Sequence, residues 1–208
     1  MDIQVWADFH CPYCMIGKQR LYRALETLKI DARVTTRSFL LNPDSLEPEG
    51  LPMAEHVQLE YGGGIPQILE DFDKLDAQAK ADGLDMKMGQ SRWANMMDAH
   101  RLFQFAQKKG LGNPFFERAQ QALFRDGLVL SNPEVLLRLA EETGLDRREA
   151  AAVLSSGQFR GEVLADDAVA RRMVIDFVPY FVVDGKYHFS GDLSFQDYLE
   201  ALRQAQRL

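Results

Sequence analysis

The chain contains two cysteines, which stand three positions apart in the segment Cys11-Pro12-Tyr13-Cys14. Residues three apart in a helix lie on one face with Cβ atoms about 5–6 Å apart, and a disulfide can bridge that separation with modest adjustment. The spacing therefore predicts a pair of thiols that can close into an internal disulfide and open again. The chemistry of such a pair is thiol–disulfide exchange.

The two thiols are expected to differ in reactivity. A strand pattern ends just before Cys11 and a helix pattern starts at Pro12, so Cys11 should lie where unpaired backbone N–H groups and the helix dipole stabilise a thiolate. Cys14, one turn further along, receives less of this stabilisation. We therefore assign Cys11 as the attacking thiol and Cys14 as the thiol that resolves the mixed disulfide. His10, directly before Cys11, is a candidate source of positive charge beside that thiolate.

Three other uses of the cysteine pair compete with exchange. A structural zinc site needs further ligands, but the chain has no second cysteine pair, and its four histidines do not have zinc-finger spacing. No metal is therefore expected; the histidines are His10, His56, His100 and His188. Two inert cysteines could pack as small apolar side chains, although a strand-to-helix junction disfavours that interpretation. A redox sensor, in which disulfide closure shifts a conformational equilibrium without turnover, remains an alternative.

The composition excludes several functional classes. Of the 208 residues, 46% are hydrophobic and 26% are charged, as in ordinary globular proteins. The 24 Lys and Arg residues are dispersed and outnumbered by 31 Asp and Glu residues, so a nucleic-acid partner is not expected. No apolar run reaches the roughly 18–20 residues that span a bilayer, and residues 1–8 do not resemble a secretory signal. We therefore expect a cytoplasmic protein without a membrane partner, in a compartment where structural disulfides are rare.

The elements that position the cysteines form a βαβ unit. Residues 3–9 alternate loosely around apolar side chains, which predicts a buried strand, and apolar positions at helical spacing predict a helix over residues 12–28. In that helix we expect four charged side chains to face water, namely Lys18, Arg20, Arg23 and Glu26. Residues 32–40 are rich in β-formers and predict a second strand beside the first.

The middle of the chain, from about residue 50 to 160, shows helical patterns without a convincing strand, which predicts an all-helical insertion. A helix is expected to follow Ser91 and to end at Gly110. Asn113 and Asn132 each precede a proline, and both are interpreted as N-caps. Asp146 is interpreted as the N-cap of a further short helix.

The last part of the chain predicts an αββα arrangement. A helical stretch around residues 159–173 precedes two apolar runs joined by Asp184-Gly185, a strong hairpin signal, and Ser194 can cap a final helix. The pattern predicts the α/β class with a mixed sheet flanked by helices. We expect residues 1–45 and 160–208 to form one discontinuous domain and residues 46–159 to form the insertion.

The residues around the cysteines resemble the active-site segment of DsbA-like oxidoreductases, specifically the FrnE-like group often described as polyketide biosynthesis oxidoreductases. The segment reads Asp8-Phe9-His10-Cys11-Pro12-Tyr13-Cys14-Met15-Ile16-Gly17-Lys18. Residues 39–44, 95–102, 122–124 and 178–182 are also similar, so the resemblance covers nearly the whole chain. It implies a thioredoxin-like fold interrupted by the helical insertion. It also implies a disulfide oxidoreductase with no cofactor beyond its redox-active cysteines.

The resemblance further implies a substrate groove. Val178-Pro179 matches a Val-Pro pair whose peptide bond is cis in the family and faces the cysteines, and the backbone before this proline can pair with an extended substrate segment. Asn95 and His100 match insertion-helix positions that face the groove, although His100 also fits a hydrogen-bonded core position. The complete set of candidate groove residues is His10, Pro12, Tyr13, Asn95, His100, Phe177, Val178 and Pro179.

Three positions depart from the family pattern. Met96 stands where Thr is usual, Phe177 stands where Gly is usual, and the expected Gln shortly after Gly191 is absent. Because Phe177 directly precedes the Val-Pro pair, it is expected to reshape the groove. The resemblance therefore carries no particular substrate over to this chain.

The same fold occurs in kappa-class glutathione transferases and 2-hydroxychromene-2-carboxylate isomerases, which use bound glutathione and typically have Ser at the position of Cys11. The presence of both Cys11 and Cys14 favours disulfide exchange, because a second thiol is needed only if an internal bridge forms. A glutathione-dependent isomerase or transferase is the alternative function. The expected partners are thiol- or disulfide-containing proteins or small molecules, with glutathione or thioredoxin as the redox partner.

Overall fold

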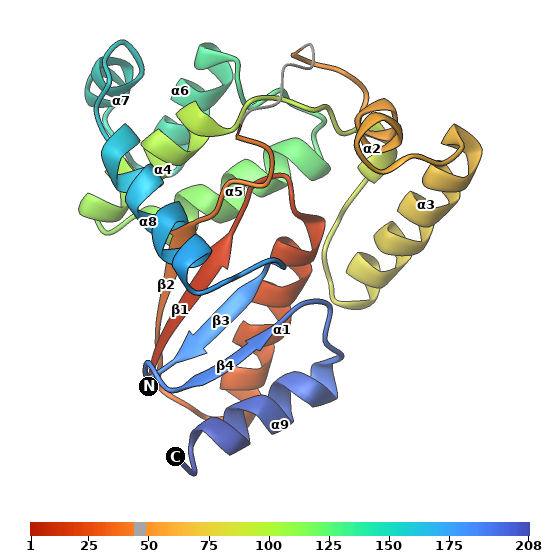
Figure 1. Ribbon diagram of the computed structural model, residues 1–208. Coiled ribbons are helices and arrows are strands. Elements are labelled where there is room, and N and C mark those ends of the chain that lie inside the picture. The colour runs from red at the N-terminus through yellow and green to blue at the C-terminus, as the bar shows by residue number, and fades with distance from the viewer. Residues whose placement is uncertain (44–48) are drawn as a thin grey trace. The chain divides into compact units, whose positions relative to one another are not determined.

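The computed structural model describes residues 1–43 and 49–208 (Figure 1). The described chain divides into two compact units, one made of Met1–Leu40 with Leu164–Leu208 and the other of Leu41–Val163. The expected domain boundary between residues 45 and 46 lies outside the described residues. Asp44, the last residue of one family-like stretch, lies outside them as well.

The first unit contains a mixed sheet. Its elements are β1 (Asp2–Ala7), α1 (Pro12–Leu28), β2 (Arg33–Ser38), most of α8 (Arg160–Arg172), β3 (Tyr180–Val183), β4 (Tyr187–Ser190) and α9 (Phe195–Ala205). Among the described residues the strands form one sheet in the order β2-β1-β3-β4. β1 is parallel to β2 and antiparallel to β3, which is antiparallel to β4. The βαβ opening, the αββα close and the mixed sheet are confirmed.

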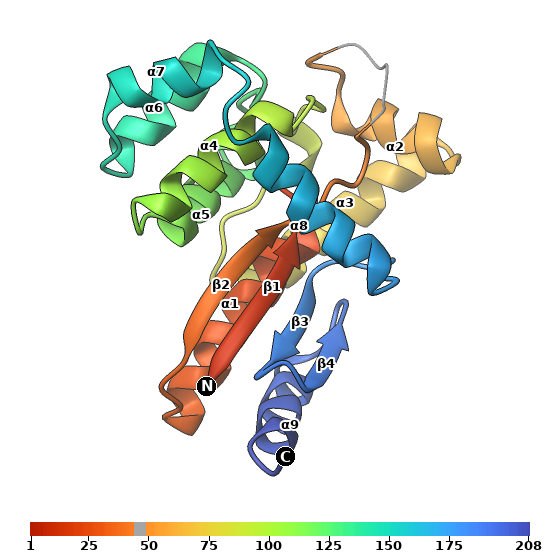
Figure 2. The same ribbon diagram turned by 60° about the vertical axis from the view of Figure 1, so that its left-hand side comes forward.

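The two faces of this sheet are covered by different helices (Figure 2). Thr36 and Phe181 both pair with Val5 and share one face, where Thr36 accepts a hydrogen bond from α1 and Phe181 packs against α9. Trp6 and Arg37 share the opposite face, and both bond to Asp166 of α8. The alternation of side chains along each strand therefore sorts the helices onto their faces.

Two charged residues of α1 that we expected to face water are buried. Lys18 is 2% exposed, and its Nζ donates a hydrogen bond to Thr36 Oγ1 at 3.1 Å. Arg20 is 8% exposed, and its guanidinium donates to the Asp192 carboxylate and the Leu193 carbonyl. The expectation was wrong for both residues because polar partners far along the chain satisfy these cations inside the unit.

The second unit is helical. Its elements are α2 (Met53–Tyr61), α3 (Ile65–Ala81), η1 (Met88–Gln90), α4 (Met97–Lys108), α5 (Gly112–Phe124), α6 (Pro133–Glu142), α7 (Arg147–Leu154) and the first residues of α8. In the part of this unit that the structure describes, β pairing is limited to a bridge between Pro52 and Arg92. Aromatic side chains fill its core; Phe103 and Phe116, for example, meet edge to face with ring centres 5.3 Å apart.

Two of the four expected helix starts in this unit are correct. Asn132 and Asp146 accept hydrogen bonds from the N–H groups of Glu134 and Glu149 and cap α6 and α7. The expected cap at Asn113 is wrong, because α5 already begins at Gly112.

The helix expected directly after Ser91 also begins later, at Met97. The backbone of Ser91 and Trp93 is instead bonded to residues 50–53, which holds this stretch in a non-helical conformation. Asn95 then satisfies the Met97 N–H through its side-chain oxygen.

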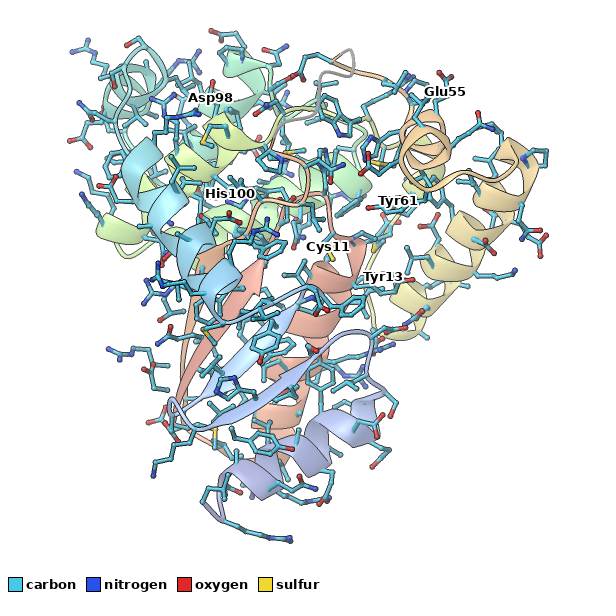
Figure 3. All side chains as sticks on the ribbon, in the orientation of Figure 1. Cys11, Tyr13, Glu55, Tyr61, Asp98 and His100 are labelled. Carbon is cyan, nitrogen blue, oxygen red and sulfur yellow. The ribbon has the colours of Figure 1, made fainter. Side chains whose placement is uncertain are left out.

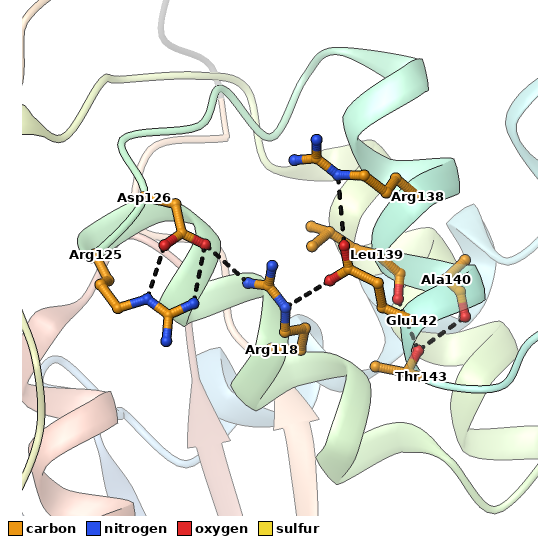
Figure 4. A network of polar contacts seen from close by, with 8 residues as sticks. All are labelled: Arg118, Arg125, Asp126, Arg138, Leu139, Ala140, Glu142 and Thr143. Atoms are coloured by element: carbon orange, nitrogen blue, oxygen red, sulfur yellow. Dashed lines mark hydrogen bonds and ion pairs between the residues drawn. The ribbon is translucent and has the colours of Figure 1, made fainter.

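An ion-pair network joins α5 to α6 within the helical unit (Figure 4). Arg118 contacts Glu142 at 2.7 Å and Asp126 at 3.2 Å, and Arg138 contacts the same Glu142 at 3.5 Å. The network connects the end of α5 with the last turn of α6, so polar side chains add to the apolar contacts between these two helices.

Candidate active site

The two segments expected to form the site meet at one end of the sheet. β1 and β3 are antiparallel, and Trp6 near the end of β1 pairs with Tyr180 at the start of β3. Residues that follow β1 must therefore lie at the same end of the sheet as residues that precede β3. This topology brings Cys11 to Val178, although 167 positions separate them in the sequence.

Cys11 is the N-cap of α1. Its backbone is extended, with φ −84° and ψ 107°, and Pro12 follows at the first helical position. The Cys11 N–H donates to the Asp8 carbonyl, and the Cys11 carbonyl accepts from the Cys14 N–H. The Cys11 thiol donates to the Val178 carbonyl with an Sγ–O distance of 3.2 Å. The predicted position of Cys11 at the helix start is confirmed.

Cys14 lies in the first turn of α1 and is completely buried. Both cysteines are free thiols in this structure. The pKa of the Cys14 thiol is raised well above its usual value, first by burial and then by its contact with Cys11; the Asp8 backbone N–H, which donates to the Cys14 sulfur, opposes this shift. Cys14 is therefore protonated at neutral pH and resists ionisation.

The Val178-Pro179 peptide bond is cis, as the resemblance implied. Val178 is buried, whereas Phe177 directly before it is 66% exposed. The aromatic ring that replaces the usual Gly thus lies at the surface of the same segment that supplies the carbonyl facing Cys11.

Three further predicted residues flank the cysteines in α1 and the turn before it. His10 is partly exposed, and its backbone N–H donates to Asp8 Oδ1 at 2.7 Å. Tyr13 lies between the two cysteines and is 40% exposed; Figure 3 shows it beside Cys11 at the start of α1. Pro12 separates Cys11 from Tyr13 and is half-buried.

Asn95 and His100 belong to the helical unit. The side-chain oxygen of Asn95 accepts a hydrogen bond from the Met97 N–H at the start of α4, and the Asn95 backbone N–H donates to the Glu49 carboxylate. His100 is fully buried on α4, near the rings of Phe103 and Phe116 (Figure 3). These surroundings account for both residues within their own unit, and their part in a groove beside the cysteines remains a prediction.

Sequence reasoning missed three residues of the first unit that surround the cysteines. Asp8 is buried, and its backbone contacts both cysteines. Pro179 and the hydroxyl of Tyr198, a residue of α9, both lie against Gly17 of α1. Asp8 could have been noticed as a charged residue at the end of a buried strand, but no local signal connects Tyr198 with a motif almost two hundred positions earlier.

The structure offers neither a metal centre nor a membrane span within the described ranges. In residues 1–43 and 49–208, no three side chains of His, Cys, Asp or Glu gather as metal ligands would. No helix formed by these residues has both the length and the apolar character needed to cross a membrane.

The fold and the site together define a thioredoxin-fold protein with a paired-cysteine centre. The family described as the DsbA-like thioredoxin domain matches residues 2–203, and the chain belongs to this family of thiol oxidoreductases. The predicted thioredoxin-like fold and the predicted DsbA-like family are thereby confirmed. Membership of the FrnE-like group stays a prediction.

Three solved structures illustrate these relationships. A probable DsbA oxidoreductase from Streptomyces coelicolor is 31% identical, with a TM-score of 0.94 over 100% of this chain and 90% of that chain. A 2-hydroxychromene-2-carboxylate isomerase is 15% identical, with a TM-score of 0.71 over 100% of this chain and 95% of that chain. The cytosolic disulfide reductase DsbM from Pseudomonas aeruginosa, with GSH, is 19% identical, with a TM-score of 0.66 over 100% of both chains. The last two show a common fold.

Proposed function

We propose that the protein is an enzyme, a thiol–disulfide oxidoreductase in which Cys11 exchanges with the substrate and Cys14 resolves the mixed disulfide. The observation that carries this proposal is the asymmetry of the pair. Cys11 is the N-cap of a helix, is 6% exposed, and its sulfur meets the Val178 carbonyl, whereas the neighbouring Cys14 is completely buried and the pKa of its thiol is raised. One thiol is thus placed for exchange with a partner, and the other is kept protonated beside it.

The reaction has two exchange steps. The Cys11 thiol loses its proton to solvent, and its thiolate attacks one sulfur of a substrate disulfide; a Cys11–substrate disulfide forms and the other substrate sulfur leaves as a thiolate. Cys14 then loses its proton and attacks the Cys11 sulfur, which closes the internal disulfide and releases the second substrate thiolate. Two electrons pass from the protein dithiol to the substrate disulfide, and the reverse sequence oxidises a substrate dithiol.

Glutathione is the redox partner that we propose, with thioredoxin as the alternative. The proposal is supported by two proteins of the same fold, the disulfide reductase DsbM, whose structure was determined with GSH, and the isomerase described above. We also propose that the protein works in the cytoplasm, since DsbM is described as cytosolic. Its substrates would be thiol- or disulfide-containing proteins or small molecules.

A glutathione-dependent isomerase is the second candidate function, favoured by the shared fold with 2-hydroxychromene-2-carboxylate isomerase. Such an enzyme needs glutathione beside Cys11 but gains nothing from a second thiol. The contact between Cys14 and Cys11 therefore favours exchange over isomerisation. Repeated turnover in a dithiol-coupled assay would in turn separate both enzymes from a redox sensor.

The test compares the variants Cys11→Ser and Cys14→Ser with the native protein in a disulfide reduction assay coupled to glutathione. Cys11→Ser should reduce turnover to background and form no mixed disulfide. Cys14→Ser should accumulate one glutathione per chain on Cys11, visible by mass spectrometry under non-reducing conditions, because the resolving thiol is missing. Equal, mild losses of turnover in both variants would contradict the assigned roles.

A further inference from the structure

Gly17 leaves a patch of bare backbone on α1, one helical turn after Cys14. A Cβ atom at Gly17 would lie 2.6 Å from the hydroxyl oxygen of Tyr198 and 2.7 Å from Cγ of Pro179. Both distances are too short for any side chain, so the Tyr198 hydroxyl and the Pro179 ring occupy the space that a side chain would take. Three segments far apart in the sequence therefore meet here: α1, α9 and the residues that precede β3.

Tyr198 is an unusual residue for this place. Its side chain is completely buried, and its ring is held edge to face by Phe181 and Phe189. Within the described residues, its hydroxyl has no hydrogen-bond partner. A buried hydroxyl without a partner lowers stability, and phenylalanine would fill most of the same space without that cost. The hydroxyl therefore needs an explanation other than fold stability.

The shared position on Gly17 connects this hydroxyl to the redox centre, because Cγ of Pro179 packs at the same place on α1. Pro179 directly follows Val178, whose carbonyl accepts a hydrogen bond from the Cys11 thiol at 3.2 Å. Only the reduced cysteine has a proton to donate, so this bond is lost when Cys11 enters a disulfide. The position of the Val178 carbonyl therefore favours the dithiol form over the disulfide.

We propose that Tyr198, packed against Gly17, is a positioning residue of the redox centre that holds Pro179, and with it the Val178 carbonyl, in contact with the Cys11 thiol. The inference rests on the proposed oxidoreductase function. It adds that Tyr198 influences the equilibrium between the dithiol and disulfide forms of Cys11 and Cys14. Burial raises the pKa of the Tyr198 hydroxyl, so this group stays neutral beside the redox centre.

The experiment measures the dithiol–disulfide equilibrium of the full chain in glutathione buffers by counting free thiols. Tyr198→Phe removes one oxygen atom and lets the Val178–Pro179 segment relax, which weakens the Cys11–Val178 bond. We expect the equilibrium constant to shift about 3–10-fold toward the disulfide, as the loss of one modest hydrogen bond predicts. The denaturation midpoint of the reduced form should not fall, because an unsatisfied polar group has been removed.

Tyr187→Phe is the matched control. It removes a hydroxyl from the adjacent hairpin, where Tyr187 donates to Gln204 at 2.8 Å, and it should leave the redox equilibrium unchanged. Gly17→Ala should shift the equilibrium in the same direction as Tyr198→Phe, because the new methyl group displaces Pro179. An equilibrium constant for Tyr198→Phe within about twofold of the native value would overturn the inference, since a hydrogen bond of ordinary strength would then not have been weakened.

The native protein separates this inference from the function on which it rests. If the native chain forms no internal disulfide at any glutathione ratio, the proposed function fails first. If the native chain forms its disulfide reversibly and Tyr198→Phe has the same dithiol–disulfide equilibrium constant, only the positioning role of Tyr198 is overturned. Equal losses of stability in both redox forms of Tyr198→Phe, with an unmoved equilibrium, would likewise show a purely structural tyrosine.

Discussion

In the proposed mechanism, Cys14 determines the order of the two exchange steps. Its complete burial and its contact with Cys11 raise the pKa of its thiol, so it stays protonated while Cys11 meets a substrate. The mixed disulfide then persists until Cys14 loses its proton, because the thiolate is the attacking species. In the proposed mechanism, this interval would allow the substrate to exchange with other thiols before the internal disulfide closes.

The closure step should therefore depend steeply on pH. Below the raised pKa of Cys14, the thiolate fraction increases about tenfold with each pH unit, and the closure rate should rise with it. The measurement is the release of glutathione from a preformed Cys11–glutathione disulfide, followed by rapid quenching between pH 6 and 9. A closure rate that does not change across this range would show that ionisation of Cys14 does not limit the step.

The positions of the two cysteines could be predicted from sequence because the patterns that place them are local. Cys11 and Cys14 are three residues apart, and the strand and helix patterns on either side place them at a helix start. Lys18 was expected to face water, since periodicity alone does not show that Thr36 would supply a buried partner. Tyr198 resembled an ordinary apolar-face residue of α9, and only the folded chain brings its hydroxyl to Gly17.

α9 is the element through which we propose that the C-terminal part of the chain supports the redox centre. It contacts α1 and brings the Tyr198 hydroxyl to Gly17, where Pro179 also packs. Its start is fixed by a capping box, in which Ser194 accepts from the Asp197 N–H and Asp197 accepts from the Ser194 N–H. The hydrogen bonds from Ser194 lower the pKa of the Asp197 carboxyl.

Loss of the capping box should destabilise the protein measurably. Ser194→Ala removes the side-chain acceptor at the N-cap of α9, and we expect the free energy of unfolding to fall by about 1 kcal/mol. Because the pKa of Asp197 is lowered in the folded protein, its contribution is present above the unfolded carboxyl pKa. That contribution is lost as the pH falls through the lowered value.

Urea denaturation at neutral and acidic pH measures this effect. The difference between native protein and Ser194→Ala should shrink on acidification. Ser155→Ala is a suitable control, since Ser155 follows the end of α7 and its hydroxyl donates to the Ala152 carbonyl. A loss in Ser155→Ala as large as that in Ser194→Ala would argue against a specific effect of the cap.

Helix starts with a local cap could be predicted, whereas those set by distant contacts could not. Asn132 and Asp146 cap their helices through their own side chains, and the sequence shows this directly. The stretch after Ser91 has helical periodicity, but its backbone bonds to Leu51 and Met53 and remains non-helical until Met97. Apolar spacing shows which side chains are buried, and long-range backbone bonds decide whether the chain is helical there.

The chain leaves the first unit after Leu40 and returns to it at Leu164. Within that unit, the residues that follow β2 are hydrogen-bonded to α8. The Leu40 N–H donates to Asp167, and Arg171 donates to the Leu40 carbonyl. These bonds join the two sequence segments of the first unit at the point where the insertion separates them.

The α/β architecture could be predicted from the sequence, whereas the ends of the two units could not. Alternating strand and helix patterns at both ends of the chain indicate one mixed sheet, and the described strands form it. The place where the domain ends has no such periodic signal. α8 runs unbroken from Arg160 to Arg172, across the division between the two units, which falls between Val163 and Leu164.

The central claim is that the whole protein is a reversible dithiol–disulfide couple. The most direct test equilibrates the native chain in glutathione buffers of graded ratio and counts free thiols after acid quenching. We predict one two-electron transition in which both thiols of each chain disappear together and return on reduction, without a stable glutathione adduct at the end point. Retention of both thiols at every ratio, or a glutathione adduct that never resolves, would contradict the account.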